Sequence, residues 1–265
     1  MKIYIGTSGY DYDTWVSNYY KTGTNKLDQY MNDFKSVELN STYYQIPKRN
    51  VWQSWADRAK QHRFVYSVKA YRSIVASRDP VNIKKYWGRF WNGCQLLDNS
   101  LGCILLQYSG KFKFDADRTD NTTAILDYLT KLLPKNVKFA FEFRHSSMFN
   151  SIIYKYFQQN KNWTIVVNHI MSNTQWFGDL VTGFHPELPI VPKLNLNFLY
   201  FRLHGTKGKY IGSYSISVLK QIVKCVKSAD VTTVFVYFNN TAHINRHAKL
   251  PDAIVDIIDL NKLLK

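Results

Sequence analysis

Two kinds of apolar segment alternate along almost the whole chain, and this alternation restricts the fold more than any other feature. Short segments rich in Val, Ile, Phe or Tyr are typical of buried strands. Longer segments with helical spacing of apolar residues lie between them. Regular alternation of strand and helix predicts a parallel α/β fold. The predicted strands are 2–6, 36–40, 64–70, 103–108, 138–144, 164–168, 198–204 and 232–239, and the predicted helices are 26–34, 52–61, 82–97, 122–133, 151–159, 215–228 and 252–263.

The number of predicted strands favours a closed barrel over an open sheet. A (β/α)8 barrel has eight strands in about 250 residues, and this chain has 265 residues. An open doubly wound sheet would alternate in the same way, but its GxGxxG fingerprint is missing between the first strand and the first helix. We therefore predict an α/β fold of the TIM-type (β/α)8 barrel class, as a single domain over residues 1–265. No helix is evident in 171–196, where we expect an extended loop.

Side chains in the predicted fifth strand divide by parity into two chemically different faces. Phenylalanine occupies positions 139, 141 and 143, whereas the opposite face carries Ala140, Glu142 and Arg144. An apolar face suits packing against helices, and a small and charged face suits a ligand cavity inside the barrel. The same test on the other strands predicts a ring of inward polar residues: Glu38, Asn40, Lys69, Gln107, Glu142, Arg144, Arg202, His204, Tyr237 and Asn239.

This polar ring predicts a functional cavity at the carboxyl ends of the strands, where TIM barrels carry their active sites. Unpaired burial of several charges would be costly, so we expect these groups to be paired, hydrated or ligand-facing. Lys69, Arg144 and Arg202 outnumber Glu38 and Glu142. The sequence therefore predicts a positive cavity that suits an anionic group.

A glycine-rich and lysine-rich segment, HGTKGKYIGSYS, follows the predicted seventh strand. Loops at this place in barrels often bind phosphate through backbone amides and a helix N-terminus. Gly205, Lys207 and Gly208 are the candidates here, and Ser213 or Ser215 could cap the next helix. The alternative is an ordinary exposed loop.

Composition bears on partners and on compartment. The formal net charge is +16, which favours polyanions, with nucleic acid as the leading candidate. The alternative is that lysines fill solvated helix faces. No run of 18 apolar residues and no secretory leader occur, and the three cysteines lack metal or redox spacing. We therefore expect a cytoplasmic protein without membrane attachment, cofactor or obligate protein partner.

Six ordered motifs span the chain from the first predicted strand to the last. They read IGTSGYDYDTW (5–15), VELNSTYY (37–44), FVYSVKA (64–70), FEFRHSSMF (141–149), FRLHG (201–205) and VYFNN (236–240). In these motifs the chain resembles the YecE-like proteins, also called domain of unknown function 72. The resemblance implies a TIM barrel similar to the endonuclease IV and xylose isomerase group, and a pocket built from the positions named above together with Asn240. The chain differs from the family pattern at Asn168 and in the segment TAHINRHAKLPD after the last strand.

The leading functional hypothesis is an enzyme, of hydrolase type, that acts on a phosphate-bearing or nucleic-acid substrate. Lys69, Arg144 and Arg202 would hold the anion while Glu142 or His204 moves a proton, with Glu38 as a third catalytic candidate. A non-catalytic nucleic-acid-binding protein is the alternative. In that case Tyr43 and Tyr44, which directly follow a strand, are candidates for stacking on bases.

Two further hypotheses depend on carboxylates. Glycoside hydrolysis would use Glu38 and Glu142, which we expect to lie too far apart on the second and fifth strands. A catalytic metal would need more ligands than the inward set provides, even with His145 and His169 nearby. We therefore predict no metal.

Overall fold

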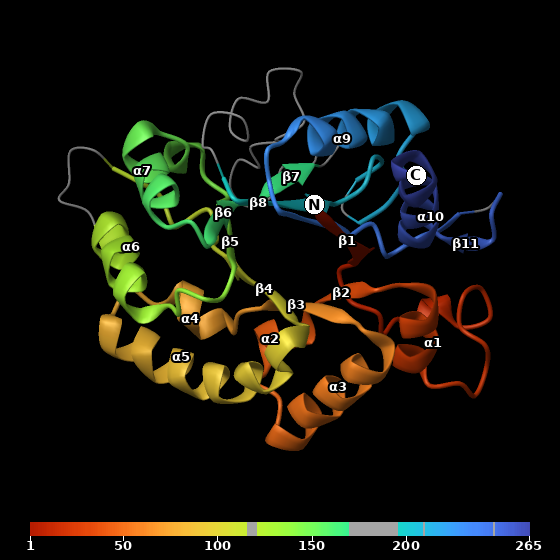
Figure 1. The fold of residues 1–265 in the computed structure, drawn as a ribbon, viewed down its shortest axis with the longest axis horizontal. Helices are drawn as coiled ribbons and strands as arrows, with labels where there is room; N and C mark the ends of the chain where they lie inside the picture. Colours follow the sequence, from red (N-terminus) through yellow and green to blue (C-terminus); the bar gives the residue numbers. More distant parts are fainter. Residues whose placement is uncertain (116–120, 170–195, 209, 246) are drawn as a thin grey trace.

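The computed structural model describes residues 1–115, 121–169, 196–208, 210–245 and 247–265. Its strands form a ring that is surrounded by helices, which is the TIM-barrel architecture (Figure 1). The strands of the ring are β1 (Lys2–Thr7), β2 (Ser36–Leu39), β3 (Val65–Lys69), β4 (Leu101–Gln107), β5 (Phe139–Glu142), β6 (Trp163–Ile165), β7 (Val167–His169), β8 (Phe198–Leu203) and β9 (Thr233–Phe238).

The ring consists of two arcs of parallel strands, β2-β3-β4-β5-β6 and β7-β8-β9-β1. One junction is made by a parallel bridge between Ser8 and Glu38, where the amide of Gly9 also donates to the carbonyl of Glu38 at 2.8 Å. At the other junction, the predicted sixth strand is interrupted at Val166. Its first half, β6, pairs with β5, and its second half, β7, pairs with β8. The eight predicted strand positions are therefore all present around the barrel.

Helices pack on the outside of the ring and begin and end within a few residues of the predicted bounds. The long helices are α1 (Lys26–Asp33), α3 (Arg49–His62), α5 (Pro80–Cys94), α6 (Asn121–Leu132), α7 (Ser151–Gln159), α9 (Ile216–Ser228) and α10 (Asp252–Leu264). Shorter helical turns that the sequence did not predict are α2 (Ser41–Tyr44), α4 (Arg72–Ala76) and three 3₁₀ helices (Asp13–Trp15, Gln95–Ser100 and Ser146–Met148). The predicted loop 171–196 lies outside the described residues except for Leu196.

No helix in the described part of the chain is both long and apolar enough to cross a membrane.

Local sequence explains where several helices begin. The side-chain oxygen of Asn25 accepts hydrogen bonds from two amides in the first turn of α1, and Asn150 does the same for α7. Asp79 caps α5, in which Pro80 takes the first position, where its missing N–H costs nothing. Ser215 caps α9, as one of the two predicted serines.

Two apolar layers lie on either side of the strands. Phe139, Phe141 and Phe143 belong to the outer layer between strands and helices, as parity predicts. The inner layer fills the barrel itself with residues such as Tyr200 and Phe235. The polar groups at the carboxyl ends of the strands therefore lie on an apolar floor.

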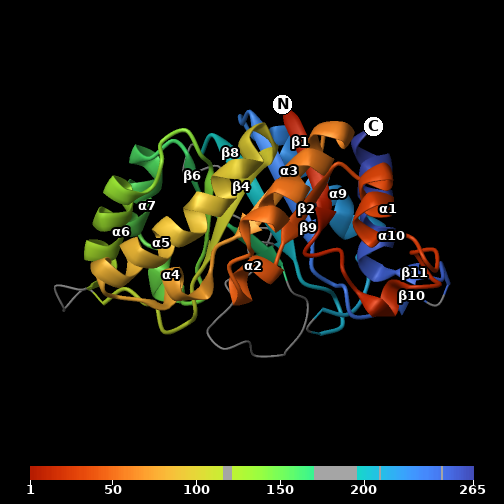
Figure 2. The ribbon, with the colours of Figure 1, turned by 90° about the horizontal axis from the view of Figure 1, so that it is seen from below.

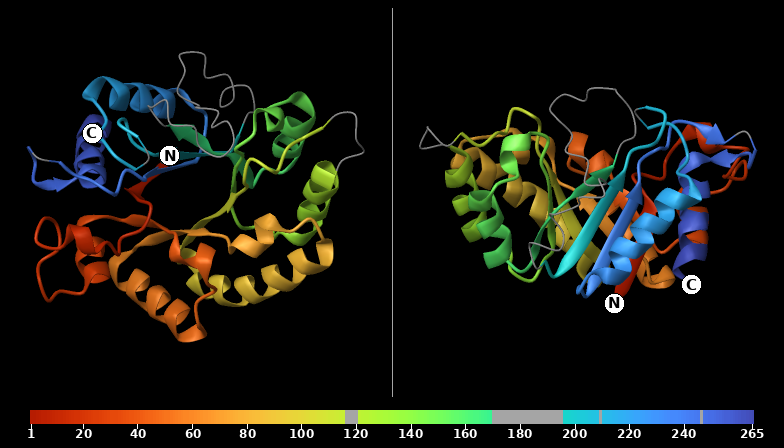
Figure 3. Two further views of the ribbon diagram at one scale, coloured as in Figure 1. Left: turned by 180° about the vertical axis from the view of Figure 1, so that it is seen from behind. Right: turned by 90° about the horizontal axis from the view of Figure 1, so that it is seen from above.

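Both chain termini lie at the amino-terminal end of the barrel, opposite α2 (Figures 2 and 3).

A short antiparallel pair, β10 (Ile244–Asn245) and β11 (Leu250–Pro251), lies in the segment TAHINRHAKLPD after β9. It connects the end of β9 to α10. The amide of Asp252 donates to the carbonyl of His243 at 3.0 Å, which closes this connection.

Closure of the barrel between β1 and β2 depends on the absence of a side chain at Gly6. A Cβ there would overlap the backbone carbonyl of Ser36. We expect Gly6→Ala to lower the free energy of unfolding by roughly 3 kcal/mol, which is the upper end of the range that is typical of overpacking substitutions. Urea unfolding measures this loss. Gly88→Ala in α5 is the matched control, because nothing lies within 4 Å of a Cβ there and alanine favours a helix. Equal effects of the two substitutions would contradict this account of the junction.

Candidate functional site

Arg202 lies at the centre of the polar layer, with a side chain only 1% exposed. It points from β8 into the barrel, where it joins two carboxylates. Its Nη2 and Nε donate to the two oxygens of Glu38 at 2.8 and 3.0 Å, and its Nη1 donates to Glu142 Oε2 at 2.5 Å. One guanidinium therefore bridges β2 and β5 across the barrel interior.

Both carboxylates are fully buried and hydrogen-bonded by further groups. Ser8 Oγ and the hydroxyl of Tyr200 donate to Glu38 at 2.5 and 2.7 Å. Gln107 Nε2 and Arg144 Nε donate to Glu142 Oε1 at 2.8 and 2.9 Å. This saturation compensates the desolvation that would otherwise make buried charges costly.

The environment of Glu142 makes it a weak base. Burial alone would raise the pKa of Glu142, but the charges of Arg202 and Arg144 outweigh burial and hold this pKa well below its usual range. A carboxylate with so low a pKa accepts a proton poorly near neutral pH. Its main effect in this structure is to anchor Arg202 and Arg144.

His204 is also buried, and both of its ring nitrogens have partners. The amide of Asn239 donates to Nδ1 at 2.9 Å, so the ring proton resides on Nε2, which lies 3.2 Å from Asn168 Oδ1. Burial, reinforced by the charge of Arg202, lowers the pKa of His204 well below its usual value. The imidazole is therefore neutral and holds Asn239 in place.

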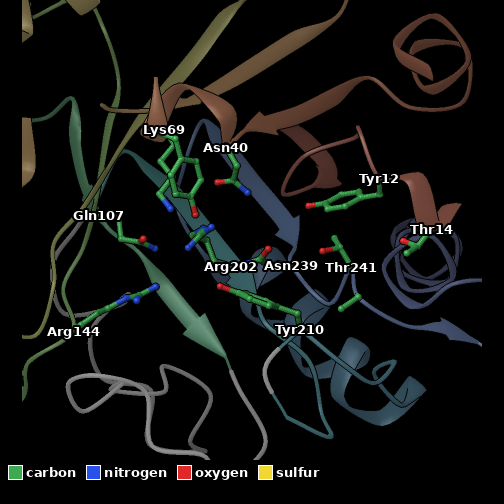
Figure 4. Close-up of a pocket in the computed structure, with 12 residues that line it drawn as sticks. Tyr12, Thr14, Asn40, Lys69, Gln107, Arg144, Arg202, Tyr210, Asn239 and Thr241 are labelled. Atoms are coloured by element: carbon green, nitrogen blue, oxygen red, sulfur yellow. The ribbon is translucent and has the colours of Figure 1, made fainter. Parts of the chain in front are cut away.

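A cavity of about 510 Å³ opens above this buried layer, at the carboxyl ends of the strands. Lys69, Gln107, Arg144 and Arg202 gather on one side of it, and Tyr12, Thr14 and Thr241 lie across from them (Figure 4). Among the described residues, no aspartate or glutamate lines the cavity. The full lining is Tyr12, Thr14, Asn40, Tyr44, Lys69, Gln107, Arg144, Arg202, Tyr210, Asn239, Thr241 and Ala242.

Lys69 is the last residue of β3 and is 8% exposed. Its Nζ lies 4.2 Å from the ring centroid of Tyr43. Within the described ranges, no carboxylate oxygen comes within 4 Å of this amine. Burial, followed by the charge of Arg202, lowers the pKa of Lys69 to about 7. Lys69 therefore changes its charge close to neutral pH.

The predicted site residues fall into three groups. The cavity lining includes Asn40, Lys69, Gln107, Arg144, Arg202 and Asn239. Directly beneath it lie Glu38, Glu142 and His204, while Tyr43 packs against Lys69. Five predicted ligand-binding residues lie elsewhere: Tyr237, Asn240 and, in the loop after β8, Gly205, Lys207 and Gly208. The hydroxyl of Tyr237 is 2.6 Å from Ser36 Oγ in the barrel interior, and the amide of Asn240 donates to Asp256 Oδ2 at 2.6 Å.

The glycine-rich segment after β8 uses its amides within the protein. The amides of Thr206 and Lys207 both donate to the carbonyl of Ile211, and the amide of Gly205 donates to the hydroxyl of Tyr214. Gly205, Lys207 and Gly208 are absent from the cavity lining in the described part of the loop. The loop instead brings Tyr210 to the cavity.

A family profile described as "Protein of unknown function DUF72" matches residues 4–260. The chain belongs to the DUF72 family. This confirms the resemblance seen in the six motifs. No curated protein matches the chain.

Solved structures resemble this DUF72 chain in fold. A DUF72 family protein from Thermotoga maritima MSB8 is 24% identical with a TM-score of 0.74, and the match covers 100% of this chain and 99% of that one. A DUF72 family protein from Enterococcus faecalis V583 is 18% identical with a TM-score of 0.70, over 99% and 97% of the two chains. An AP endonuclease, family 2, from Brucella melitensis is 10% identical with a TM-score of 0.53, over 90% and 93%.

The sequence analysis of this DUF72 chain named Tyr44 but missed five other lining residues: Tyr12, Thr14, Tyr210, Thr241 and Ala242. These residues lie beyond the ends of β1, β8 and β9, Thr14 in the 3₁₀ helix Asp13–Trp15, where strand alternation no longer indicates direction. The available signal was the run of tyrosines and threonines directly after the strands, together with the first family motif, which contains Tyr12 and Thr14.

The donor groups of this DUF72 site do not fit a metal centre. No cluster of three or more His, Cys, Asp or Glu side chains suited to a metal ion occurs among the residues that the structure describes. Arg202 engages the carboxylates of Glu38 and Glu142, and asparagines engage His204. These are the groups that a metal would need.

Removal of the guanidinium tests whether the buried charges depend on it. Among the described residues, Arg202→Met leaves Glu38 without a charged partner and Glu142 with Arg144 alone, so we expect a loss of about 3–5 kcal/mol in the free energy of unfolding, measured with urea. The triple variant Glu38→Gln/Glu142→Gln/Arg202→Met should recover much of this loss. Arg58→Met is the control, because its pair with Asp28 is partly exposed and is expected to contribute about 0–1 kcal/mol. Equal losses for the two arginines would contradict this role of Arg202.

The pH dependence of stability tests the environment of Lys69. The pKa of Lys69 is about 7 in the folded protein and about 10.4 in an unfolded chain. Between these values the unfolded chain binds more protons, so stability rises with pH across this window. Lys69→Met lacks this gain. We expect the variant to be more stable than the native chain below pH 7, with a difference that shrinks toward pH 10 in thermal unfolding. Lys220→Met on α9, exposed in the fold, should leave the profile unchanged.

Proposed function

We propose that the protein is an enzyme that acts on a phosphate-bearing substrate, with nucleic acid as the leading substrate class. The observation that carries this proposal is the cavity itself. It lies at the active end of a TIM barrel, and its lining contains Lys69, Arg144 and Arg202 but no acidic residue from the described part of the chain. Such a lining favours a ligand with negative charge.

The charged groups at and beneath the cavity largely neutralise one another. Glu38, Glu142, Arg144 and Arg202 sum to zero, because two carboxylates lie against two guanidiniums. Among the charged groups that the structure describes at the site, Lys69 then decides whether their sum is neutral or positive.

Planar and amide donors at the cavity suit phosphate oxygens. Arg144 combines charge with a forked set of N–H donors, and Gln107 and Asn40 add side-chain amides. Across from them, Tyr12 and Tyr210 present rings and hydroxyl groups to the remainder of a ligand (Figure 4). The arrangement therefore separates an anion-binding side from an aromatic side.

Two further observations support nucleic acid as the substrate class. The chain carries a formal net charge of +16, which attracts polyanions. A protein of similar fold is named as an AP endonuclease. Another is named as a D-psicose 3-epimerase, at 10% identity and a TM-score of 0.54, so the fold alone leaves sugar substrates open. The net charge is what favours the polyanion.

The carboxylate pair gives no support to glycoside hydrolysis. Glu38 and Glu142 both lie against the guanidinium of Arg202, and both are buried beneath the cavity. An acid and a base for a glycosidic bond would need to face the substrate. Nucleic-acid binding without catalysis remains the competing proposal, and it requires the basic surface rather than the cavity.

Binding of sulfate and of short single- and double-stranded nucleic acids across a salt series tests the proposal. Arg144→Gln should weaken both by roughly ten- to a hundredfold, because a hydrogen bond to a charged group contributes about 1.5–3 kcal/mol. Lys220→Gln removes the same charge from an exposed position on α9 and is expected to bind like the native chain. Arg202 is unsuitable here, because its removal would disturb the barrel. Nucleic-acid binding that is strong but indifferent to Arg144 would overturn the proposal in favour of a surface-binding protein.

A further inference from the structure

We propose that Lys69 is a nucleophilic amine that forms an imine with the aldehyde of a phosphate-bearing sugar in the cavity. This inference rests on the proposed function, because it assumes that the cavity binds the phosphate group of the same molecule. It goes beyond that function by naming the reacting group of the protein and the reacting group of the substrate. The shared substrate chemistry is a sugar aldehyde that carries a phosphate, either free or within a nucleic-acid strand.

The position of Lys69 is well defined by the barrel. The residue ends β3, and the hydroxyl of Thr42 donates to its carbonyl at 2.6 Å. The next amide, of Ala70, donates to the carbonyl of Leu105 at 2.9 Å, so the strand end is held on both sides. The aliphatic part of the side chain is buried, and the amine lines the cavity over the ring of Tyr43. A ligand in the cavity therefore meets the amine at a fixed place.

The surroundings of Lys69 favour a free amine. A lysine that serves only as a charge usually has a carboxylate partner, but the described residues place none within 4 Å of Nζ. The nearby carboxylates are instead directed at Arg202. Burial lowers the pKa of Lys69 to about 7, so a large fraction of the amine is unprotonated at neutral pH. Desolvation and neighbouring cations are known to activate a lysine as a nucleophile, because both lower the pKa of its amine.

The two other side chains predicted to take part in the chemistry, Glu142 and His204, are less suited to react than Lys69. Glu142 is held ionised by two guanidiniums, and His204 has partners on both ring nitrogens. The hydroxyl groups at the cavity are poor alternatives, because burial raises the pKa of Tyr12 to about 12 and also raises that of Tyr210. Among the lining residues described, Lys69 is thus the side chain best suited to react near pH 7.

The reaction balances without an oxidant, a reductant or a second substrate. The lone pair of Nζ attacks the carbonyl carbon, a C–N bond forms, and the carbonyl π electrons move to oxygen. The resulting carbinolamine loses water, whose oxygen comes from the carbonyl and whose two hydrogens come from the amine. A C=N bond remains. Arg144 and Gln107, on the same side of the cavity as Lys69, would hold the phosphate during these steps (Figure 4).

Reductive trapping tests this inference on the full chain. The protein is incubated with 2-deoxyribose 5-phosphate and sodium cyanoborohydride, which converts an imine into a stable amine, and the modified peptide is identified by mass spectrometry. We expect modification at Lys69, at least tenfold faster than with 2-deoxyribose, and at a rate that rises through pH 7. Lys69→Arg should abolish it, whereas Lys220→Arg should react like the native chain. Thermal unfolding of each variant verifies that it is folded.

Every outcome of the trapping experiment has a defined meaning. Modification that is spread over surface lysines, or that is unchanged in Lys69→Arg, overturns the inference. Retained sulfate binding without a Lys69 adduct also overturns it, and the proposed function stands. If 2-deoxyribose modifies Lys69 as fast as 2-deoxyribose 5-phosphate does, Lys69 is still the nucleophile. The phosphate then contributes nothing to binding, which contradicts the proposed function. An oligonucleotide with an abasic site distinguishes the sources, since faster trapping than with 2-deoxyribose 5-phosphate identifies a nucleic-acid strand.

Discussion

The contact of Arg202 with Glu38 and Glu142 is the interaction on which the carboxyl-terminal half of the barrel depends. Three distant strands supply these groups, and Ser8, Tyr200, Gln107 and Arg144 complete their hydrogen bonds. Two buried carboxylates without this guanidinium would be strongly destabilising, whereas a fully hydrogen-bonded set is tolerated. The network fills the barrel above its apolar floor with charged groups whose positions are set by one another.

This network also determines the chemistry of the cavity. Because the carboxylates are directed inward at Arg202, they are absent from the described lining of the cavity. The positively charged side chains of Lys69, Arg144 and Arg202 are part of that lining. The buried arginine further disfavours a second positive charge on Lys69, which contributes to its lowered pKa. The network that holds the strands together thus helps to lower the pKa of the Lys69 amine at the cavity.

Local sequence patterns were reliable wherever one strand or one helix decides the outcome. Alternation along β5 placed Phe141 outward and Glu142 inward, and Ser215 was one of two predicted caps for α9. The patterns were less informative about partners. The sequence placed Glu38 and Glu142 on strands nearly across the barrel, but it did not indicate that both would contact Arg202, whose long side chain reaches across the barrel interior. Similarly, the amides of the loop after β8 are used internally, which composition could not show.

From the amino-acid sequence alone we could predict the α/β barrel, its eight strand positions, the inward direction of Lys69, Gln107 and Arg202, and the membership in the DUF72 family. These properties follow from periodicity and motifs, which are local and repeat along the chain. Tertiary structure alone decided which charges neutralise one another, which nitrogens of His204 are engaged, and how loop residues such as Tyr12 and Tyr210 complete the cavity. Those properties depend on distances between residues far apart in the chain, and a linear pattern carries no such distances.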